Sequence, residues 1–151
     1  MNRNTNKINI AGLAVLLTYV IFITYRLFFY AYSNNYRGQM TNVSYNLVLF
    51  KTVSNYIQHM NRLGFDILLY NLAGNIAAFM PLGFLLPLAF RGFNALKTYM
   101  VSFALILLAE VLQFVSRRGV FDVDDLLLNM LGSIIGYGIY KLFFMLFKGR
   151  R

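Results

Sequence analysis

Long apolar runs alternate with short polar stretches along the whole chain. Apolar residues dominate four segments, at about residues 9–32, 67–90, 97–116 and 125–147. Each segment reaches the roughly 20 residues that a helix needs to cross the hydrocarbon core of a bilayer. The pattern predicts an all-α membrane protein with four transmembrane helices. The sequence has no internal repeat, so we expect a single membrane domain over residues 1–151.

A longer polar segment, residues 33–66, separates the first two predicted spans and forms the expected outer loop. Its second half places apolar residues at helical spacing, opposite polar ones: Val53, Tyr56, Ile57 and Met60 against Ser54, Asn55, Gln58 and Arg62. This spacing predicts a short amphipathic helix, which either lies in the membrane interface or caps the bundle. The same segment holds His59, which we expect to be a surface residue, because a catalytic histidine needs partners.

Composition supports a membrane protein and excludes several functions. The chain is 59% hydrophobic and 13% charged, whereas about a quarter of the residues in a soluble domain are charged. It has no cysteine, which excludes disulfides and thiolate metal sites. The formal net charge is +9, but the basic residues are scattered and form no patch for nucleic acid. We therefore expect contact with anionic lipids and none with nucleic acid.

The distribution of basic residues predicts the orientation. With four crossings, both termini and the loop at 91–96 share one side of the membrane. Lysine and arginine are concentrated there in short segments, at Arg3, Lys7, Arg91, Lys97, Lys148, Arg150 and Arg151. The positive-inside rule then places both termini in the cytoplasm of a multi-pass protein of a bacterial plasma membrane.

Polar residues inside the four spans fall at one depth. In this orientation, and at 1.5 Å per residue, each span carries them in its outer half: Arg26 in the first, Asn71 and Asn75 in the second, Glu110 and Gln113 in the third, Asp124, Asp125 and Asn129 in the fourth. An ionised side chain that faces lipid costs at least ~3 kcal/mol. We therefore expect Glu110, Asp125 and Arg26 to face one another, in a polar pocket that opens outward.

Three interpretations of this pocket remain open. Clustered carboxylates can perform general acid–base catalysis, or hold a divalent cation against a phosphate; no other cofactor is predicted. The cluster can also be a hydrogen-bonded network that fixes helix packing. Asp122 and Asp124, taken alone, would be exposed loop acids. The spacing Gly132-x-x-x-Gly136 predicts close approach of another helix.

The same residues resemble the VanZ-like family of small bacterial membrane proteins. Three motifs occur in order: Asn75, Phe79, Pro81 and Gly83 (N-x3-F-x-P-x-G); Glu110 and Gln113; then Asp122, Asp125, Asn129 and Gly132 (D-x2-D-x3-N-x2-G). Together with Gly136 they extend over residues 75–136. Two departures are evident, because Leu49 replaces the proline of an N-L-x-P-F motif, and Gly119, beside Arg118, replaces a family arginine.

The resemblance implies low-level resistance to teicoplanin-type lipoglycopeptides, through an effect at the cell surface. Glu110, Gln113, Asp122 and Asp125 would make polar contacts with a lipid-linked cell-wall component or a lipoglycopeptide. Arg118 or Arg26 would pair with its carboxylate or phosphate, and Asn75 and Asn129 would supply amide hydrogen bonds. The alternatives are an intramembrane enzyme acting on a phosphate-containing lipid through Glu110, Asp122 and Asp125, and a structural bundle whose glycines pack against another protein. The sequence predicts no oligomeric state.

Overall fold

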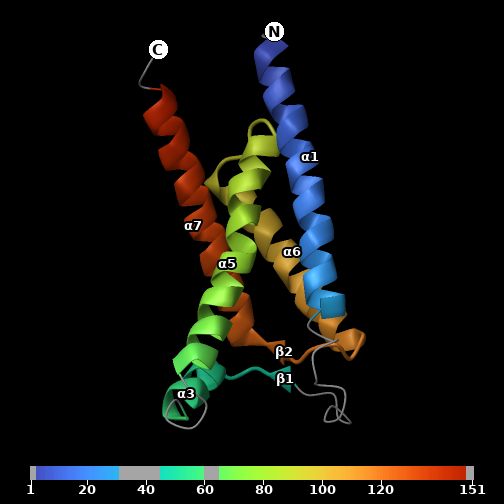
Figure 1. Cartoon of the computed structure of the whole chain (residues 1–151), viewed down its shortest axis with the longest axis vertical. Coiled ribbons are helices and arrows are strands. Elements are labelled where there is room, and N and C mark those ends of the chain that lie inside the picture. The colour runs from blue at the N-terminus through green and yellow to red at the C-terminus, as the bar shows by residue number, and fades with distance from the viewer. Residues whose placement is uncertain (1–2, 31–44, 60–64, 149–151) are drawn as a thin grey trace.

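A computed structural model describes residues 3–30, 45–59 and 65–148. Half of the expected outer loop, including Met60 and Arg62, therefore lies outside the described residues. In chain order the elements are α1 (Arg3–Tyr25), η1 (Arg26–Tyr30, a π-helical turn), β1 (Tyr45–Asn46), α3 (Lys51–Gln58), α5 (Phe65–Ala89), α6 (Ala95–Val115), β2 (Phe121–Asp122) and α7 (Val123–Lys148) (Figure 1).

Four of the helices are long and apolar enough to cross a membrane. The spanning segments are Ile10–Phe29, Leu68–Ala89, Ala95–Val115 and Val123–Phe147, each within a few residues of the segment expected from hydropathy. The all-α fold and the four spans are thereby confirmed, and the chain is a multi-pass membrane protein. Both termini lie at one end of the bundle with the α5–α6 loop, while α3, β1 and β2 lie at the other (Figure 1).

Helices α5 and α7 form the tightest helix pair, because glycines remove the side chains between them. A Cβ atom at Gly132 would overlap the carbonyl oxygen of Ile76, and one at Gly136 that of Met80. Gly83 of α5 meets the backbone of Ser133 in the same way. The close approach predicted from the glycine spacing is therefore made within the chain, and another protein's helix is not what fills this face.

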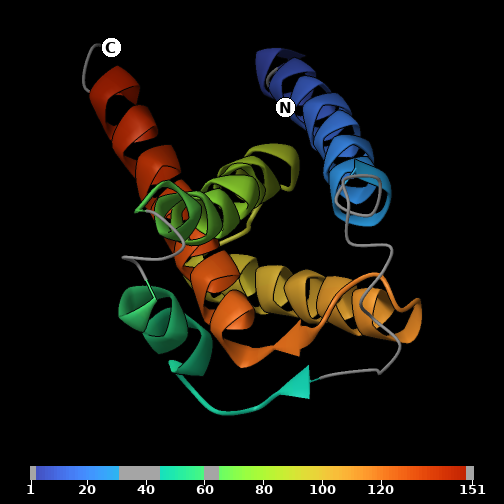
Figure 2. The same cartoon turned by 60° about the horizontal axis from the view of Figure 1, so that its bottom comes forward.

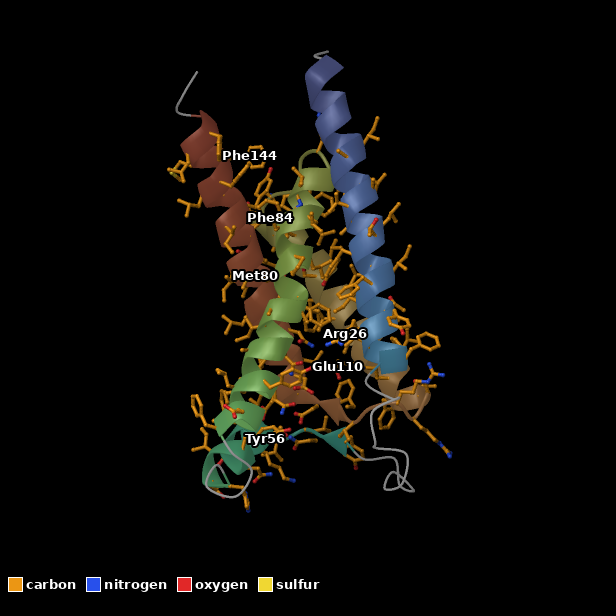
Figure 3. All side chains as sticks on the ribbon, viewed as in Figure 1. Arg26, Tyr56, Met80, Phe84, Glu110 and Phe144 are labelled. Carbon is orange, nitrogen blue, oxygen red and sulfur yellow. The ribbon has the colours of Figure 1, made fainter. Side chains whose placement is uncertain are left out.

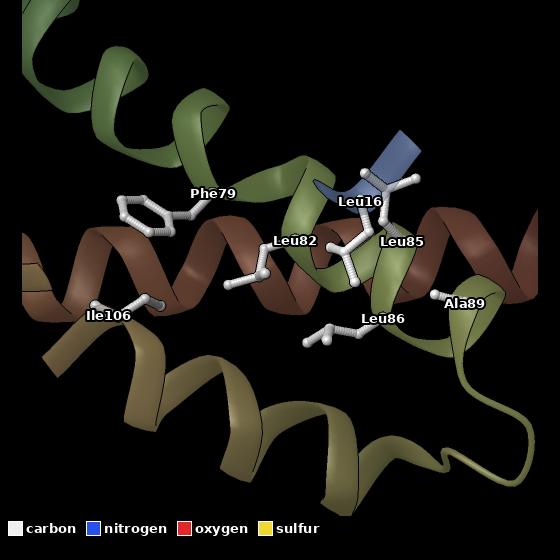
Figure 4. Packing of buried hydrophobic residues seen from close by; sticks show 7 residues of the cluster. All are labelled: Leu16, Phe79, Leu82, Leu85, Leu86, Ala89 and Ile106. Carbon is white, nitrogen blue, oxygen red and sulfur yellow. The ribbon is translucent and has the colours of Figure 1, made fainter. Parts of the chain in front are cut away.

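A small apolar core lies where α1 and α6 pack against α5. It consists of Leu16 from α1, five residues of α5 and Ile106 of α6, with the α5 members being Phe79, Leu82, Leu85, Leu86 and Ala89 (Figure 4). Pro81 and Pro87 lie inside α5, which nevertheless continues from Phe65 to Ala89, as neighbouring helices allow in a membrane bundle. α5 is thus the central helix of the fold.

Polar contacts inside the bundle add to this packing. Ser133 of α7 donates a hydrogen bond to Ser102 of α6 over 2.7 Å, and both side chains are buried. α6 begins at a side-chain cap, since Asn94 accepts a hydrogen bond from the backbone N–H of Lys97, which satisfies a donor at the first turn. The hydrogen bond between Ser133 and Ser102 joins α6 to α7, and Glu110 lies on the same helix α6.

Two short strands connect distant parts of the chain. β1 pairs with β2 in parallel, with Tyr45 opposite Phe121 and Asn46 opposite Asp122. The pairing brings α3 under the ends of α5 and α7, as the view from that end shows (Figure 2). The short helix between the first two spans is therefore present, whereas its placement in a membrane interface stays a prediction.

Candidate functional site

Helices α3, α5, α6 and α7 enclose a polar cavity of about 400 Å³ at the end of the bundle away from the termini. Its lining combines acids, amides and hydroxyls with a few apolar side chains: Asn46, Lys51, Thr52, Val53, Tyr56, Asn71, Leu72, Asn75, Glu110, Gln113, Gly119, Val120, Asp122, Asp124, Asp125 and Leu128. The polar side chains gather around Glu110 and above Tyr56 (Figure 3). The polar residues expected at one depth of the second, third and fourth spans thus line one cavity, except Asn129, which is outside its lining.

Glu110 of α6 and Asp125 of α7 line the cavity, and each accepts a hydrogen bond from an asparagine side chain. Asn129 donates an amide hydrogen bond to Glu110 over 3.4 Å, and Asn75 donates one to Asp125 over 2.6 Å. Glu110 is 6% exposed, although it lines the cavity. A carboxylate can accept about four hydrogen bonds, so both groups keep capacity to receive donors from a ligand.

Asn129 lies behind Glu110 and completes this polar wall. It is buried, and its side-chain oxygen has no hydrogen-bond partner in the described part of the chain. A buried amide oxygen without a donor is unfavourable. Asn129 nevertheless supports the position of Glu110 through the hydrogen bond that it donates.

Asp122 serves the fold at the same time as it lines the cavity. It accepts hydrogen bonds from the hydroxyl of Thr52 and the amide of Asn46. It also accepts one from the backbone N–H of Asp124 over 2.9 Å, which caps the first turn of α7. The expectation of an exposed loop acid was wrong here, because Asp122 is 6% exposed.

Asp124 lines the cavity, although sequence reasoning had not assigned it to the site. Its carboxylate accepts hydrogen bonds from the backbone N–H groups of Phe50, Thr52 and Val53 at the start of α3. Asp124 is 1% exposed, so the expectation of an exposed acid was wrong for it too. We call these contacts the Asp124 clip. The sequence shows two acids in the first turn of the predicted helix. It does not indicate that the hydrogen-bond donors for one of them lie more than seventy positions away.

The two expected arginines lie beside the cavity rather than in its lining. Arg118 donates to the carbonyl of Phe28 over 3.2 Å and lies 5.1 Å from the centre of the Phe29 ring. Arg26 is partly buried at nearly the height of Glu110 (Figure 3). Gln113 lines the cavity and donates to the carbonyl of Leu27. These contacts join the end of α1 and η1 to the acidic wall.

The apolar face of α3 turns partly toward the bundle. Val53 and Tyr56 are partly buried and line the cavity, whereas Ile57 is exposed. His59 is exposed, with its ring Nδ1 2.9 Å from the carbonyl oxygen of Asn55. α3 therefore closes one side of the cavity, and it brings Thr52 and Lys51, which sequence reasoning had not assigned to the site.

The acids of the cavity do not form a metal site by themselves. Among residues 3–30, 45–59 and 65–148, no group of three or more His, Asp or Glu side chains is arranged to hold a metal ion. A divalent cation, which remains a hypothesis, would bind with Glu110 and Asp125 only if a substrate supplied further oxygen ligands.

Comparison with known proteins agrees with this architecture. The sequence profile of the family described as VanZ/LLP1 matches residues 13–144. The chain belongs to the VanZ/LLP1 family. All four spanning segments and every residue of the cavity lie in or overlap the matched range.

A curated relative of the chain is "Protein VanZ" from Enterococcus faecium. It is 31% identical to the chain over 68 residues, which are 45% of this chain and 42% of the relative. The aligned region thus covers less than half of that protein's length. No solved structure matches the chain.

Proposed function

We propose that the cavity binds the polar head of an amphiphile at the outer surface of the membrane, either a lipid-linked cell-wall component or a lipoglycopeptide such as teicoplanin. The observation that carries the proposal is the position of Glu110 and Asp125. Both carboxylates come from spanning helices and line the cavity, and ionisable residues inside a membrane are costly and usually functional. The lipoglycopeptide itself is proposed on the family resemblance.

The acids of the cavity divide into two groups by their contacts. Asp122 and Asp124 each accept several hydrogen bonds from the segment 46–53 or the start of α7, and thereby hold the cavity wall. Glu110 and Asp125 accept theirs from Asn129 and Asn75 and keep acceptor capacity for a ligand. We therefore expect ligand contact at Glu110 and Asp125, and support of the cavity by Asp122 and Asp124.

The test is teicoplanin susceptibility of a sensitive Gram-positive host that expresses the wild type, Glu110→Gln or Asp125→Asn. Asp66→Asn is the matched control, because Asp66 is an exposed acid in the first turn of α5. Membrane abundance is quantified for each protein. We expect the wild type and the Asp66 variant to protect and the two cavity variants, at equal abundance, to lose protection.

Two other results would contradict parts of this proposal. If the cavity variants protect as well as the wild type, Glu110 and Asp125 serve packing and the cavity does not bind the ligand. If the wild type gives no protection, teicoplanin is not its ligand, and binding of lipid-linked cell-wall components to purified protein becomes the test.

A second candidate function is an intramembrane enzyme acting on a phosphate-containing lipid. It is favoured by the two carboxylates that share one cavity, since paired carboxylates can act as general acid and base. It predicts turnover by the purified protein in detergent or lipid, lost in Glu110→Gln and dependent on an added divalent cation. Binding without turnover would leave the first proposal in place and exclude this one.

A further inference from the structure

The segment Tyr45–Phe50, which we call the apolar loop, exposes an unusual run of large apolar side chains. Leu47, Val48, Leu49 and Phe50 are consecutive, and their exposed fractions are 61%, 60%, 54% and 62%. Tyr45 is exposed as well. Four adjacent apolar residues are unfavourable in water, and a continuous exposed patch of this kind marks an interaction surface.

The loop is held in a fixed shape by the fourth spanning helix. β1 pairs with β2, which immediately precedes α7, and the backbone N–H of Phe50 donates to Asp124 inside α7. Phe50 has a φ of 61°, a left-handed conformation that is unfavourable for a residue with a Cβ. The protein therefore maintains an unfavourable backbone conformation while it presents the apolar side chains outward.

The same contacts fix the depth of the loop. The fourth spanning segment begins at Val123, one residue after the Asp122 that pairs with Asn46. Asp124 lies in the first turn of that segment. The loop is therefore level with the first turn of the fourth spanning segment.

The helices that contact α3 also expose apolar side chains near their N-terminal ends. α3 contacts both α5 and α7, whose first turns expose Phe65, Leu69 and Leu127. Lys51, directly after Phe50, is exposed and can extend its ammonium group to lipid phosphates. An apolar run followed by a lysine at this level matches the chemistry of the lipid interface.

We propose that the apolar loop is inserted into the lipid leaflet, at the boundary between head groups and acyl chains, next to the polar cavity. Asn46 and Lys51, at the two ends of the run Leu47–Phe50, line the cavity, so one segment contacts lipid with its middle and the cavity with its ends. If the proposed function holds, an amphiphile reaches the cavity from the leaflet, with its tail among the lipids. The insertion itself does not depend on that function.

Tryptophan fluorescence tests the insertion, because the chain contains no tryptophan. The single variants Tyr45→Trp and Leu49→Trp are reconstituted into lipid nanodiscs, with Leu105→Trp, an exposed residue in the middle of α6, as the deep reference. N-acetyltryptophanamide in the same buffer is the aqueous reference. Quenching is measured with acrylamide and with lipids brominated either near the head group or near the end of the chain.

We expect both loop variants to show emission shifted to the blue of the aqueous reference, low acrylamide quenching, and stronger quenching by the lipid brominated near the head group. This corresponds to a depth of about 5–10 Å, as for interfacial segments. Emission and acrylamide quenching equal to the aqueous reference would overturn the insertion. Quenching like that of Leu105→Trp would place the loop in the hydrocarbon core and overturn the proposed depth.

A second measurement guards against a preference of tryptophan for the interface. The chain also has no cysteine, so Leu49→Cys carries a single spin label whose collisions with oxygen and with a water-soluble nickel chelate report depth. We expect oxygen collisions to dominate, and dominance of the nickel chelate would refute the insertion. Neither experiment uses a ligand, so failure of the insertion is distinguishable from failure of the proposed function.

Discussion

Asp124 acts at a distance from its own helix, because its carboxylate receives the free backbone donors at the start of α3. The first N–H groups of a helix have no partner within the helix. Phe50 precedes α3 as a cap without a side-chain hydrogen bond of its own, and the Asp124 clip supplies the missing acceptor. The Asp124 side chain therefore caps the N-terminus of α3 and attaches α3 to α7.

We expect Asp124→Asn to destabilise the protein by about 1–3 kcal/mol, because one carboxylate oxygen becomes an amide nitrogen and leaves buried N–H donors without an acceptor. Unfolding of the purified protein in detergent, followed by circular dichroism, measures the change. Asp66→Asn is the control, and we expect its effect to stay below about 1 kcal/mol, as for an exposed acid in a first turn. Equal effects of the two substitutions would show that the clip adds no stability.

At this scale, sequence reasoning identified residue types better than it identified contacts. Glu110, Gln113, Asn75 and Asp125 were placed together because helical spacing and depth depend only on local geometry, and the structure places all four in the cavity lining. Asp122, which was also expected in the site, lines the cavity as well, but the hydrogen bonds that bury Asp122 and Asp124 were not predicted. Their donors lie in the segment 46–53, and no periodicity in the sequence encodes a contact across seventy positions.

Helix packing depends on where glycine removes a side chain. The face of α7 that meets α5 carries Gly132 and Gly136, where a Cβ atom would overlap backbone atoms of α5. Gly138, two positions on, has nothing within 4 Å of such an atom. The helix thus contains both an essential site and its own internal control.

We expect Gly132→Ala and Gly136→Ala to destabilise the fold by about 1–3 kcal/mol or more, since an added methyl group at a packed site forces the backbones apart. Gly138→Ala should be neutral or stabilising, because alanine is the better helix former. Thermal unfolding in detergent compares the three variants. A Gly136 variant as stable as the Gly138 variant would contradict the close packing of α5 on α7.

The hydrogen bond between Ser133 and Ser102 offers a second element-scale test. A double-mutant cycle with Ser102→Ala and Ser133→Ala should give a coupling energy of about 0.6 kcal/mol, the average for such bonds between membrane helices. Unfolding by a denaturing detergent supplies the four stabilities. Strictly additive effects would mean that the two hydroxyls contribute independently.

The elements themselves were predictable to different degrees. The four spans follow from hydropathy, because twenty apolar residues leave few alternatives to a membrane helix. The short helix was predicted from its spacing, although part of its apolar face meets the cavity. The pairing of β1 with β2 was not predicted, since strands of two residues have too few positions for a pattern.

The polar cavity lies at one end of the molecule, opposite the termini and the α5–α6 loop (Figure 1). The common end of the two termini could be predicted from the even number of spans. The position of α3 beside the cavity could not be predicted, because it depends on the Asp124 clip. The side of the membrane on which the cavity lies stays a prediction from the basic residues.

We expect the cavity to lie on the outer side, and labelling of single cysteines checks this in a chain that has none. Ser116→Cys lies in the exposed turn after α6, and Arg91→Cys in the loop between α5 and α6. A membrane-impermeant maleimide should label the first variant in intact cells and the second only after lysis. The reverse pattern would place the cavity in the cytoplasm and exclude direct action on a component of the cell surface.

The Asp124 clip also has a consequence for biogenesis. Its hydrogen bonds join residues 71 to 74 positions apart, and the acceptor belongs to α7, which is translated after α3, α5 and α6. α3 is therefore translated before Asp124, and its hydrogen bonds to Asp124 form only after α5 and α6 have been synthesised. Nascent chains stalled before residue 124 should leave α3 open to proteolysis, whereas released chains protect it. α7 thus fixes the position of α3, a helix that is translated before α5 and α6.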